Sequence, residues 1–276
     1  MRTFIHIIII IYSIMNSPLC LLASSSPPVY TYKIIKAYPH DQDAFTEGLV
    51  FENGDLFEST GIKGRSTIRQ VNLEDGKILS LHKLEHVFFG EGITIYKDRI
   101  IQLTYQSHLG FVYNKKTLKP IGKFNYPTQG WGITSDGQQL IMSDGTSKLY
   151  FLDPETFKLL RWVEVHTDKG PVSGLNELEY IQGEIFANVY PTERIVKIAP
   201  QTGEVTGWIN LEGILNEQNP IRPGCSLNGI AYDAEKNKIF VTGKFYPKVF
   251  EIEILPMSGG ADGIRTRDLL RDRETP

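Results

Sequence analysis

Cysteine is nearly absent from this chain of 276 residues, which contains only Cys20 and Cys225. If an N-terminal leader that includes Cys20 is removed, no intramolecular disulfide can form, and stability must come from a hydrophobic core. The net charge is only −3, and no basic cluster marks a surface for nucleic acid. No segment keeps a helical period of apolar residues over three turns. These absences exclude a disulfide-stabilised scaffold, a nucleic-acid-binding protein and a helical bundle.

The two ends of the chain differ in composition from the rest. Residues 1–26 carry one basic residue near their start, then an apolar run, then small residues, which is the order of a secretory signal peptide. We therefore expect a secreted or periplasmic protein, with an uncleaved N-terminal anchor as the alternative. Residues 258–276 mix Arg with acidic residues and have no apolar periodicity, so we expect a disordered or spurious tail. The folded domain then covers residues 27–257.

The central segment consists of short alternating or β-branched runs separated by turn residues, a pattern typical of an all-β protein. A short strand motif, in most copies polar–Gly–aliphatic, recurs there at intervals of 40 to 51 residues, each copy followed by a turn and further strands. The five copies are Glu47-Gly48-Leu49, Glu91-Gly92-Ile93, Trp131-Gly132-Ile133, Glu177-Leu178-Glu179 and Asn228-Gly229-Ile230. A four-stranded unit of this length repeated five times predicts a five-bladed β-propeller.

The closure of the ring can also be predicted. The fifth repeat has no further strand after residues 249–254, whereas residues 30–38, ahead of the first repeat, have the pattern of an outer strand. We expect residues 30–38 to complete the last blade, because joining the two chain ends in one sheet removes an exposed edge.

The repeated motif also indicates where a site would lie. In a propeller the innermost strands converge on the central channel, so the residues that open the motif should surround one channel mouth. These residues are Glu47, Glu91, Trp131, Glu177 and Asn228. The glycine persists in four repeats while its neighbour varies, which favours a scaffold that carries a site. The alternative is that the acids only solvate the channel mouth or bind backbone amides.

Nine motifs, in order across residues 38–253, resemble those of the plant and bacterial glutaminyl cyclases. They are Phe45-Thr46-Glu47-Gly48, Glu58-Ser59-Thr60-Gly61, Gly64-Arg65-Ser66, Phe89-Gly90-Glu91-Gly92, Gly130-Trp131-Gly132, Ser143-Asp144-Gly145-Thr146, Leu175-Asn176-Glu177-Leu178-Glu179, Leu227-Asn228-Gly229-Ile230-Ala231 and Val241-Thr242-Gly243-Lys244. The resemblance implies a five-bladed propeller that turns the N-terminal glutamine of peptides or proteins into pyroglutamate, releasing ammonia. It also implies no zinc and no other cofactor.

The resemblance implies a set of site residues. They are Phe45, Glu47, Glu91, Tyr105, Trp131, Asn176, Tyr190 and Lys244. Glu47 stands where glutamine is usual in the plant enzymes, and Tyr105 and Tyr190 stand where tryptophan is usual. These exchanges put the fit of the substrate in doubt more than the reaction.

The reaction suggests a role for each group. The α-amine attacks the side-chain amide of the same residue, so a carboxyl group must move a proton from the amine to the departing ammonia. We assign this role to Glu91, and stabilisation of the oxyanion to Lys244 and Asn176. Substrate binding is expected of the remaining candidates, in which Glu177 is included because of its place in the repeat. These are Phe45, Glu47, Tyr105, Trp131, Glu177 and Tyr190.

Two other functions remain open. A calcium-dependent, lactonase-like hydrolase would use Glu47, Glu91 and Glu177 as ligands. A non-catalytic module would bind Gln-peptides without consuming them. Among the six histidines only His82 and His86 are close in sequence, and their spacing does not match a structural zinc site. We expect a monomer with no nucleic-acid partner.

Overall fold

The computed structural model describes residues 26–215 and 222–257, and every regular element in them is a β-strand. No helix long and apolar enough to cross a membrane occurs in these residues. Apart from residue 26, the predicted signal peptide lies outside the described residues, as does the predicted tail.

Three sheets each contain four consecutive antiparallel strands. The first is formed by β2 (Thr46–Glu52), β3 (Asp55–Thr60), β4 (Thr67–Val71) and β5 (Ile78–Lys83). The second is formed by β6 (Gly90–Tyr96), β7 (Arg99–Thr104), β8 (Leu109–Asn114) and β9 (Pro120–Asn125). The third is formed by β10 (Ile133–Ser135), β11 (Leu140–Ser143), β12 (Lys148–Leu152) and β13 (Leu159–Glu164).

The rest of the chain forms a two-stranded hairpin and one larger sheet of eight strands. The hairpin pairs β14 (His166–Thr167) with β15 (Gly170–Pro171). The large sheet has, in order, β16 (Leu175–Ile181), β17 (Glu184–Val189), β18 (Arg194–Ile198), β19 (Val205–Asn210), β1 (Val29–Pro39), β22 (Lys248–Pro256), β21 (Lys238–Lys244) and β20 (Ser226–Asp233).

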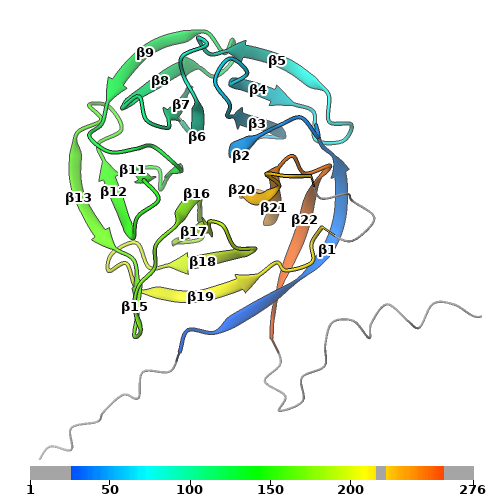
Figure 1. Cartoon of the computed structure of the whole chain (residues 1–276), viewed down its shortest axis with the longest axis vertical. Helices are drawn as coiled ribbons and strands as arrows, with labels where there is room; N and C mark the ends of the chain where they lie inside the picture. The colour runs from blue at the N-terminus through cyan, green and yellow to red at the C-terminus, as the bar shows by residue number, and fades with distance from the viewer. Residues whose placement is uncertain (1–25, 216–221, 258–276) are drawn as a thin grey trace, which may run out of the picture.

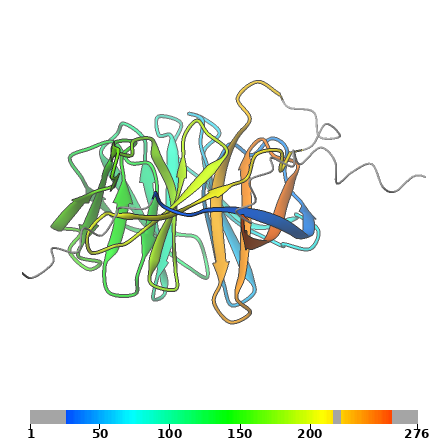
Figure 2. The same ribbon diagram turned by 90° about the horizontal axis from the view of Figure 1, so that it is seen from below.

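The sheets are arranged radially, as in a β-propeller. Figure 1 shows β2, β6, β16 and β20 near the axis, and β5, β9, β13, β19 and β1 at the outer rim. Seen from the side, many strands run up and down along the axis of the ring, and β1 (blue) crosses its side (Figure 2). The all-β prediction is therefore confirmed.

The predicted pairing of the N-terminal strand with the last strand of the chain is also confirmed. β1 pairs antiparallel with β22 from Tyr30 opposite Pro256 to Pro39 opposite Lys248. A feature that the sequence does not indicate is a short parallel pairing of β1 with β19, where Val29 lies opposite Trp208. β1 thus joins β16–β19 to β20–β22 within the eight-stranded sheet.

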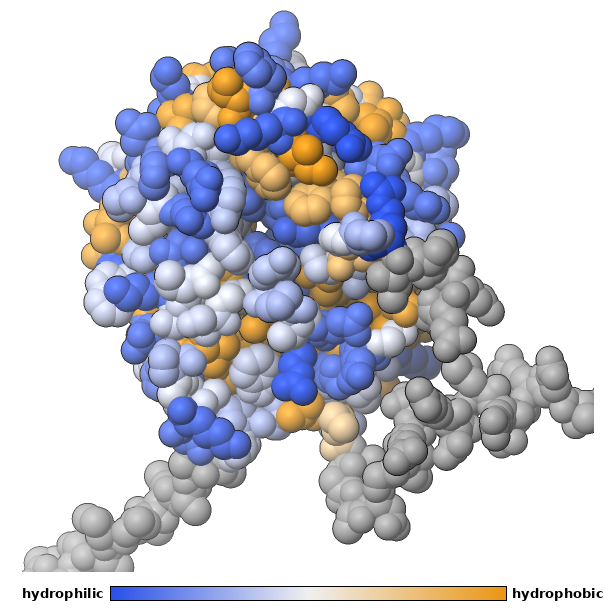
Figure 3. Space-filling view, viewed as in Figure 1, coloured by the Kyte–Doolittle hydropathy of each residue, from blue (hydrophilic) through white to orange (hydrophobic). Residues whose placement is uncertain are grey.

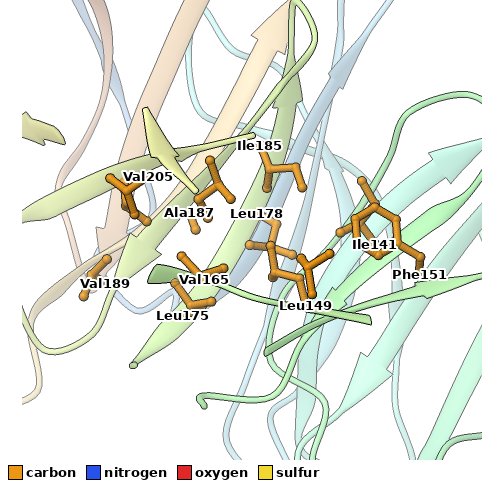
Figure 4. Packing of buried hydrophobic residues seen from close by; sticks show 13 residues of the cluster. Ile141, Leu149, Phe151, Val165, Leu175, Leu178, Ile185, Ala187, Val189 and Val205 are labelled. Carbon is orange, nitrogen blue, oxygen red and sulfur yellow. The ribbon is translucent and has the colours of Figure 1, made fainter. Parts of the chain in front are cut away.

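Hydrophobic clusters fill the wedges between neighbouring sheets. In the cluster of Figure 4, Ile141 and Phe151 of the third sheet pack against Leu178 and Ile185 of β16 and β17. Burying each such side chain contributes about 1.5–3 kcal/mol. The face in Figure 3, by contrast, mixes hydrophilic and apolar residues, so the main apolar contacts lie inside the ring.

The innermost strands approach each other backbone to backbone. A Cβ atom added to Gly48 would lie 2.5 Å from Ile93 N, and one added to Gly92 would lie 2.6 Å from Trp131 O. Neither position has room for a side chain, because real Cβ atoms do not come so close to backbone atoms. The glycines of the repeated motif therefore bring together the residues that precede them.

Candidate active site

A cavity of about 200 Å³ opens beside the innermost strands. It is lined by Phe45, Glu47, Phe89, Glu91, Tyr105, Trp131, Asn176, Tyr190 and Lys244. Eight of the nine residues expected from the sequence are thus brought together. Phe89 was missed, although the sequence carries a signal for it: Phe89 and Phe45 occupy the same place in two copies of Phe-x-Glu-Gly.

Glu177 does not line this cavity. A Cβ atom added to Gly132 would lie 2.9 Å from Glu177 Cα, just as one added to Gly92 would lie 2.7 Å from Gly132 Cα. Glu177 therefore occupies the glycine position of the fourth repeat, and Asn176 is the equivalent of Glu47. The sequence alignment of this repeat was wrong by one residue, which sends the side chain in another direction because successive residues of a strand alternate.

Glu177 instead links inner strands across the axis. It is fully buried, and its two carboxyl oxygens accept backbone hydrogen bonds from Leu49 N (3.2 Å) and Ile230 N (2.8 Å). These donors belong to β2 and β20, whereas Glu177 belongs to β16. The side chain thus supplies two acceptors that a glycine could not.

We predict that Glu177→Gln destabilises the fold without changing the reaction. The carboxamide NH₂ group would face one of the two backbone N–H donors and leave it unsatisfied, at a cost of about 1–3 kcal/mol. Denaturant unfolding measures this loss, and Glu253→Gln on the exposed surface of β22 is the matched control. Equal stability of the two variants would contradict the linking role.

An arc of aromatic rings forms the wall of the cavity. Successive ring centroids are 6.0 Å apart for Phe45 and Phe89, 5.9 Å for Phe89 and Tyr105, 6.3 Å for Tyr105 and Trp131, and 6.1 Å for Trp131 and Tyr190. The gap between the two ends of the arc is bridged by a cation. Lys244 Nζ lies 4.6 Å from the Phe45 centroid and 5.5 Å from that of Tyr190.

Two buried carboxyl groups meet at this cavity. Glu47 and Glu91 are only 2% and 5% exposed, and they lie close enough for the charge of Glu47 to act on Glu91. Glu47 Oε1 lies 2.9 Å from Lys244 Nζ, and Glu47 Oε2 accepts a 3.0 Å hydrogen bond from Asn228 Nδ2. Glu47 is thus the better stabilised anion of the pair.

The pKa values of the two acids follow from these contacts. Burial raises the pKa of Glu47 to about 7, although the charge of Lys244 opposes the rise. Burial and the negative charge of Glu47 raise the pKa of Glu91 well above its ordinary value. Because two adjacent carboxylates repel each other, the pair loses its protons in two separate steps, and Glu91 is the weaker acid of the two.

The backbone of Asn176, another polar residue of the cavity, is held in place by Ser143. Ser143 Oγ donates to Asn176 O (2.7 Å) and accepts from Gly132 N (2.7 Å), which locks β16 against the entry to β10. Among the residues that the structure describes, none donates a hydrogen bond to the buried Asn176 Oδ1. Asn176 thus keeps hydrogen-bonding capacity for a bound molecule.

The acids do not form a cluster of metal ligands. Within residues 26–215 and 222–257, no group of three or more His, Cys, Asp or Glu side chains is arranged to hold a metal ion. The three acids named for calcium do not converge, because Glu177 is bonded to backbone N–H groups elsewhere.

Comparison with known proteins agrees with this geometry. A family model described as glutamine cyclotransferase matches residues 7–254. A curated glutaminyl-peptide cyclotransferase of Arabidopsis thaliana is 41% identical over 228 residues, which cover 80% of this chain and 71% of the relative. The crystal structure of Myxococcus xanthus glutaminyl cyclase matches with a TM-score of 0.79 and 35% identity, covering 84% of this chain and 99% of that one. The chain therefore belongs to the glutamine cyclotransferase family.

Proposed function

We propose that this protein converts the N-terminal glutamine of peptides or proteins into pyroglutamate and releases ammonia. The observation that carries the proposal is the pair of buried acids, Glu47 and Glu91, that line an aromatic cavity beside Lys244. Such a pair can exchange a proton with a substrate while the surrounding rings exclude water.

The proposed reaction needs no net proton from the protein. The α-amine nitrogen attacks the carbonyl carbon of the γ-carboxamide, forming the C–N bond of the five-membered ring. Glu91 takes a proton from the attacking amine and returns one to the amide nitrogen, and the C–N bond to that nitrogen then breaks to release ammonia. Its raised pKa suits both steps, because a higher pKa makes the carboxylate a stronger base toward the amine proton than an ordinary glutamate.

Other cavity residues have supporting roles. Lys244 is the cation nearest to the acid pair and stabilises the oxyanion of the tetrahedral intermediate. Asn176, which also lines the cavity, contributes a polar contact. The rings of Phe45, Trp131 and Tyr190 pack against the methylene groups of the glutamine. Together they hold the side chain folded back toward its own amine.

The test is a coupled assay of ammonia release by the purified protein. A peptide beginning with Gln should release ammonia, whereas a peptide with Gln in the second position should not, because its side-chain amide cannot reach a free α-amine. Binding of the first peptide without ammonia release would support a binding module instead. Activity on lactones that is lost with a calcium chelator would support the hydrolase.

Replacement of Glu47 by Gln is predicted to shift the pH dependence of the reaction. Glu47 raises the pKa of Glu91 by its charge, so removing that charge lowers the pKa of Glu91. The acidic limb of the kcat profile should therefore move to lower pH, by on the order of one unit. The control is Glu85→Gln, an exposed residue, whose profile should match that of the parent. A shift to higher pH, or none, would show that Glu47 does not tune Glu91.

We further propose a five-bladed architecture, in which the eight-stranded sheet counts as two blades. This count is supported by the shortness of the parallel contact between β19 and β1, which divides the sheet into two units of four strands. We infer one catalytic domain, residues 27–257, that acts as a monomer. The sequence pattern of residues 1–26 supports a secreted or periplasmic location.

A further inference from the structure

A second cluster of buried charges begins seven residues before Glu47 in the chain. It consists of His40, Glu58 and Arg69, which are 9%, 1% and 5% exposed, with the partly exposed Asp41 at its edge. None of these residues lines the cavity that contains Glu47 and Glu91. Two positive and two negative groups form this cluster, so its charges balance if His40 is protonated.

The carboxyl group of Glu58 is surrounded by donors. Its Oε2 atom accepts hydrogen bonds from Arg69 Nε (2.9 Å) and Nη2 (2.7 Å), and its Oε1 atom accepts one from Thr46 Oγ1 (2.6 Å). Burial would raise the pKa of Glu58, but the charges of His40 and Arg69 outweigh burial and hold it well below its ordinary value. Glu58 is therefore an ionised carboxylate that only accepts hydrogen bonds.

The imidazole of His40 lies between two acceptors. Its Nδ1 atom is 2.6 Å from Tyr246 O, and a backbone carbonyl oxygen can only accept. Its Nε2 atom is 2.9 Å from Glu58 Oε1, which is an acceptor as well. Both nitrogens must then carry a proton, and the ring is an imidazolium cation.

The surroundings of His40 are consistent with this charge. Burial lowers the pKa of His40, but the carboxylate of Glu58 and the carbonyl of Tyr246 more than offset it and raise the pKa above the ordinary value, against a smaller opposing effect of Arg69. Thr242 Oγ1 also faces the ring, 3.5 Å from Nδ1.

This cation joins two segments that both contribute to the cavity. Phe45 and Glu47 flank Thr46, whose hydroxyl is bonded to Glu58, while Tyr246 lies two residues beyond Lys244. Backbone bonds run parallel to the side-chain contacts, from His40 N to Pro247 O (3.0 Å) and from Phe245 N to Ala44 O (2.7 Å). The segments come from the beginning and the end of the chain, so no local structure holds them together.

We propose that His40 is a positioning residue for the cyclisation. As a doubly protonated imidazolium, it holds the turn after Lys244 against the segment that carries Phe45 and Glu47, and so sets the place of Lys244 relative to the acid pair. The proposal rests on the proposed function, because the spacing of these groups matters only if the cavity performs the reaction.

The protonation state can be measured without any activity. Nitrogen-15 NMR of the histidine rings of the full chain should show one ring that remains doubly protonated at pH 8, where exposed histidines are neutral. In Glu58→Gln this signal should change to that of a ring with one protonated nitrogen, and in His40→Gln it should disappear. A neutral His40 in the parent at pH 7 would overturn the proposal.

The positioning role is tested by kinetics on the same variants. His40→Gln can donate to only one of the two acceptors, and kcat for a Gln-peptide should fall by between about ten- and a hundredfold, because displacement of catalytic groups by about 1 Å costs that much. The fall should persist far below the melting temperature and exceed any change in KM. A purely structural role would lower the melting temperature and leave kcat unchanged in the cold.

Two further variants provide a substitute test and a control for the kinetic experiment. Thr46→Val removes only the hydroxyl that links Glu58 to the Glu47 segment, and carries the same kinetic test if His40→Gln does not fold. His166→Gln is the matched control, because His166 is exposed and contacts one carbonyl oxygen, Glu164 O. An unchanged kcat in Thr46→Val overturns the proposal. If the parent itself releases no ammonia, the proposed function fails, while the NMR result still reports on His40.

Discussion

Replacing Glu91 by Gln is expected to leave the protein folded and to reduce ammonia release from a Gln-peptide by about a hundred- to ten-thousandfold. The amide is nearly the same size as the acid, so the buried position can accept it. It cannot take up or deliver a proton at neutral pH, however, and no proton can then be shared with Glu47. The loss should appear in kcat, measured by the coupled ammonia assay.

Two comparisons make the Glu91 result specific. Lys244→Ala should lose less activity, because it removes one stabilising charge and not the route of the proton. Glu85→Gln, at an exposed position, should behave as the parent. If Glu91→Gln keeps a rate within about tenfold of the parent, Glu91 is not the proton carrier.

Deletion of residues 27–38 is expected to abolish the cooperative unfolding transition of the whole ring. The deletion removes most of the pairing partner of β22 and the contact with β19. It also removes Tyr38, which is 4% exposed and belongs to the cluster around Leu49 and Phe240. Loss of such a side chain alone costs about 3–5 kcal/mol, against a total stability of about 5–15 kcal/mol for a typical protein.

The measurement is thermal unfolding followed by circular dichroism. Ile35→Ala is the matched control, because Ile35 lies in the same strand but is 49% exposed, and its loss should change stability by less than about 0.5 kcal/mol. A truncated protein that melts at the temperature of the parent would show that β1 is dispensable for closure.

The strands could be predicted from the sequence because their signals are local. Alternating apolar residues separated by turn residues mark the hairpins, as at the Gly-containing turn Glu52–Asp55 between β2 and β3. The pairing of β1 with β22 could be predicted because the fifth repeat lacks a fourth strand, and the residues before the first repeat have the pattern of an outer strand. The pairing of β1 with β19 could not, since it depends on where the outer strands meet in three dimensions.

The site was predicted less completely, because the register of the fourth repeat cannot be read from the sequence. The fourth repeat lacks the glycine that marks the others, and the register of β16 against β17 shifts between Leu175 and Leu178. A shift of one residue cannot be read from apolar spacing, so Glu177 was given the place of Asn176. The proximity of Glu47 and Glu91 also could not be foreseen, because it follows from the close approach of Gly48 to the Gly92 backbone.

The pairing of β1 with β22 has a consequence for synthesis on the ribosome. β1 leaves the ribosome first and its antiparallel partner last, so the strand waits for nearly the entire domain to be translated, on the order of tens of seconds. During this time its backbone groups are open to pairing with other nascent chains. The backbone groups of β1 that pair with β22 in the folded protein are therefore a site of possible aggregation in the nascent chain.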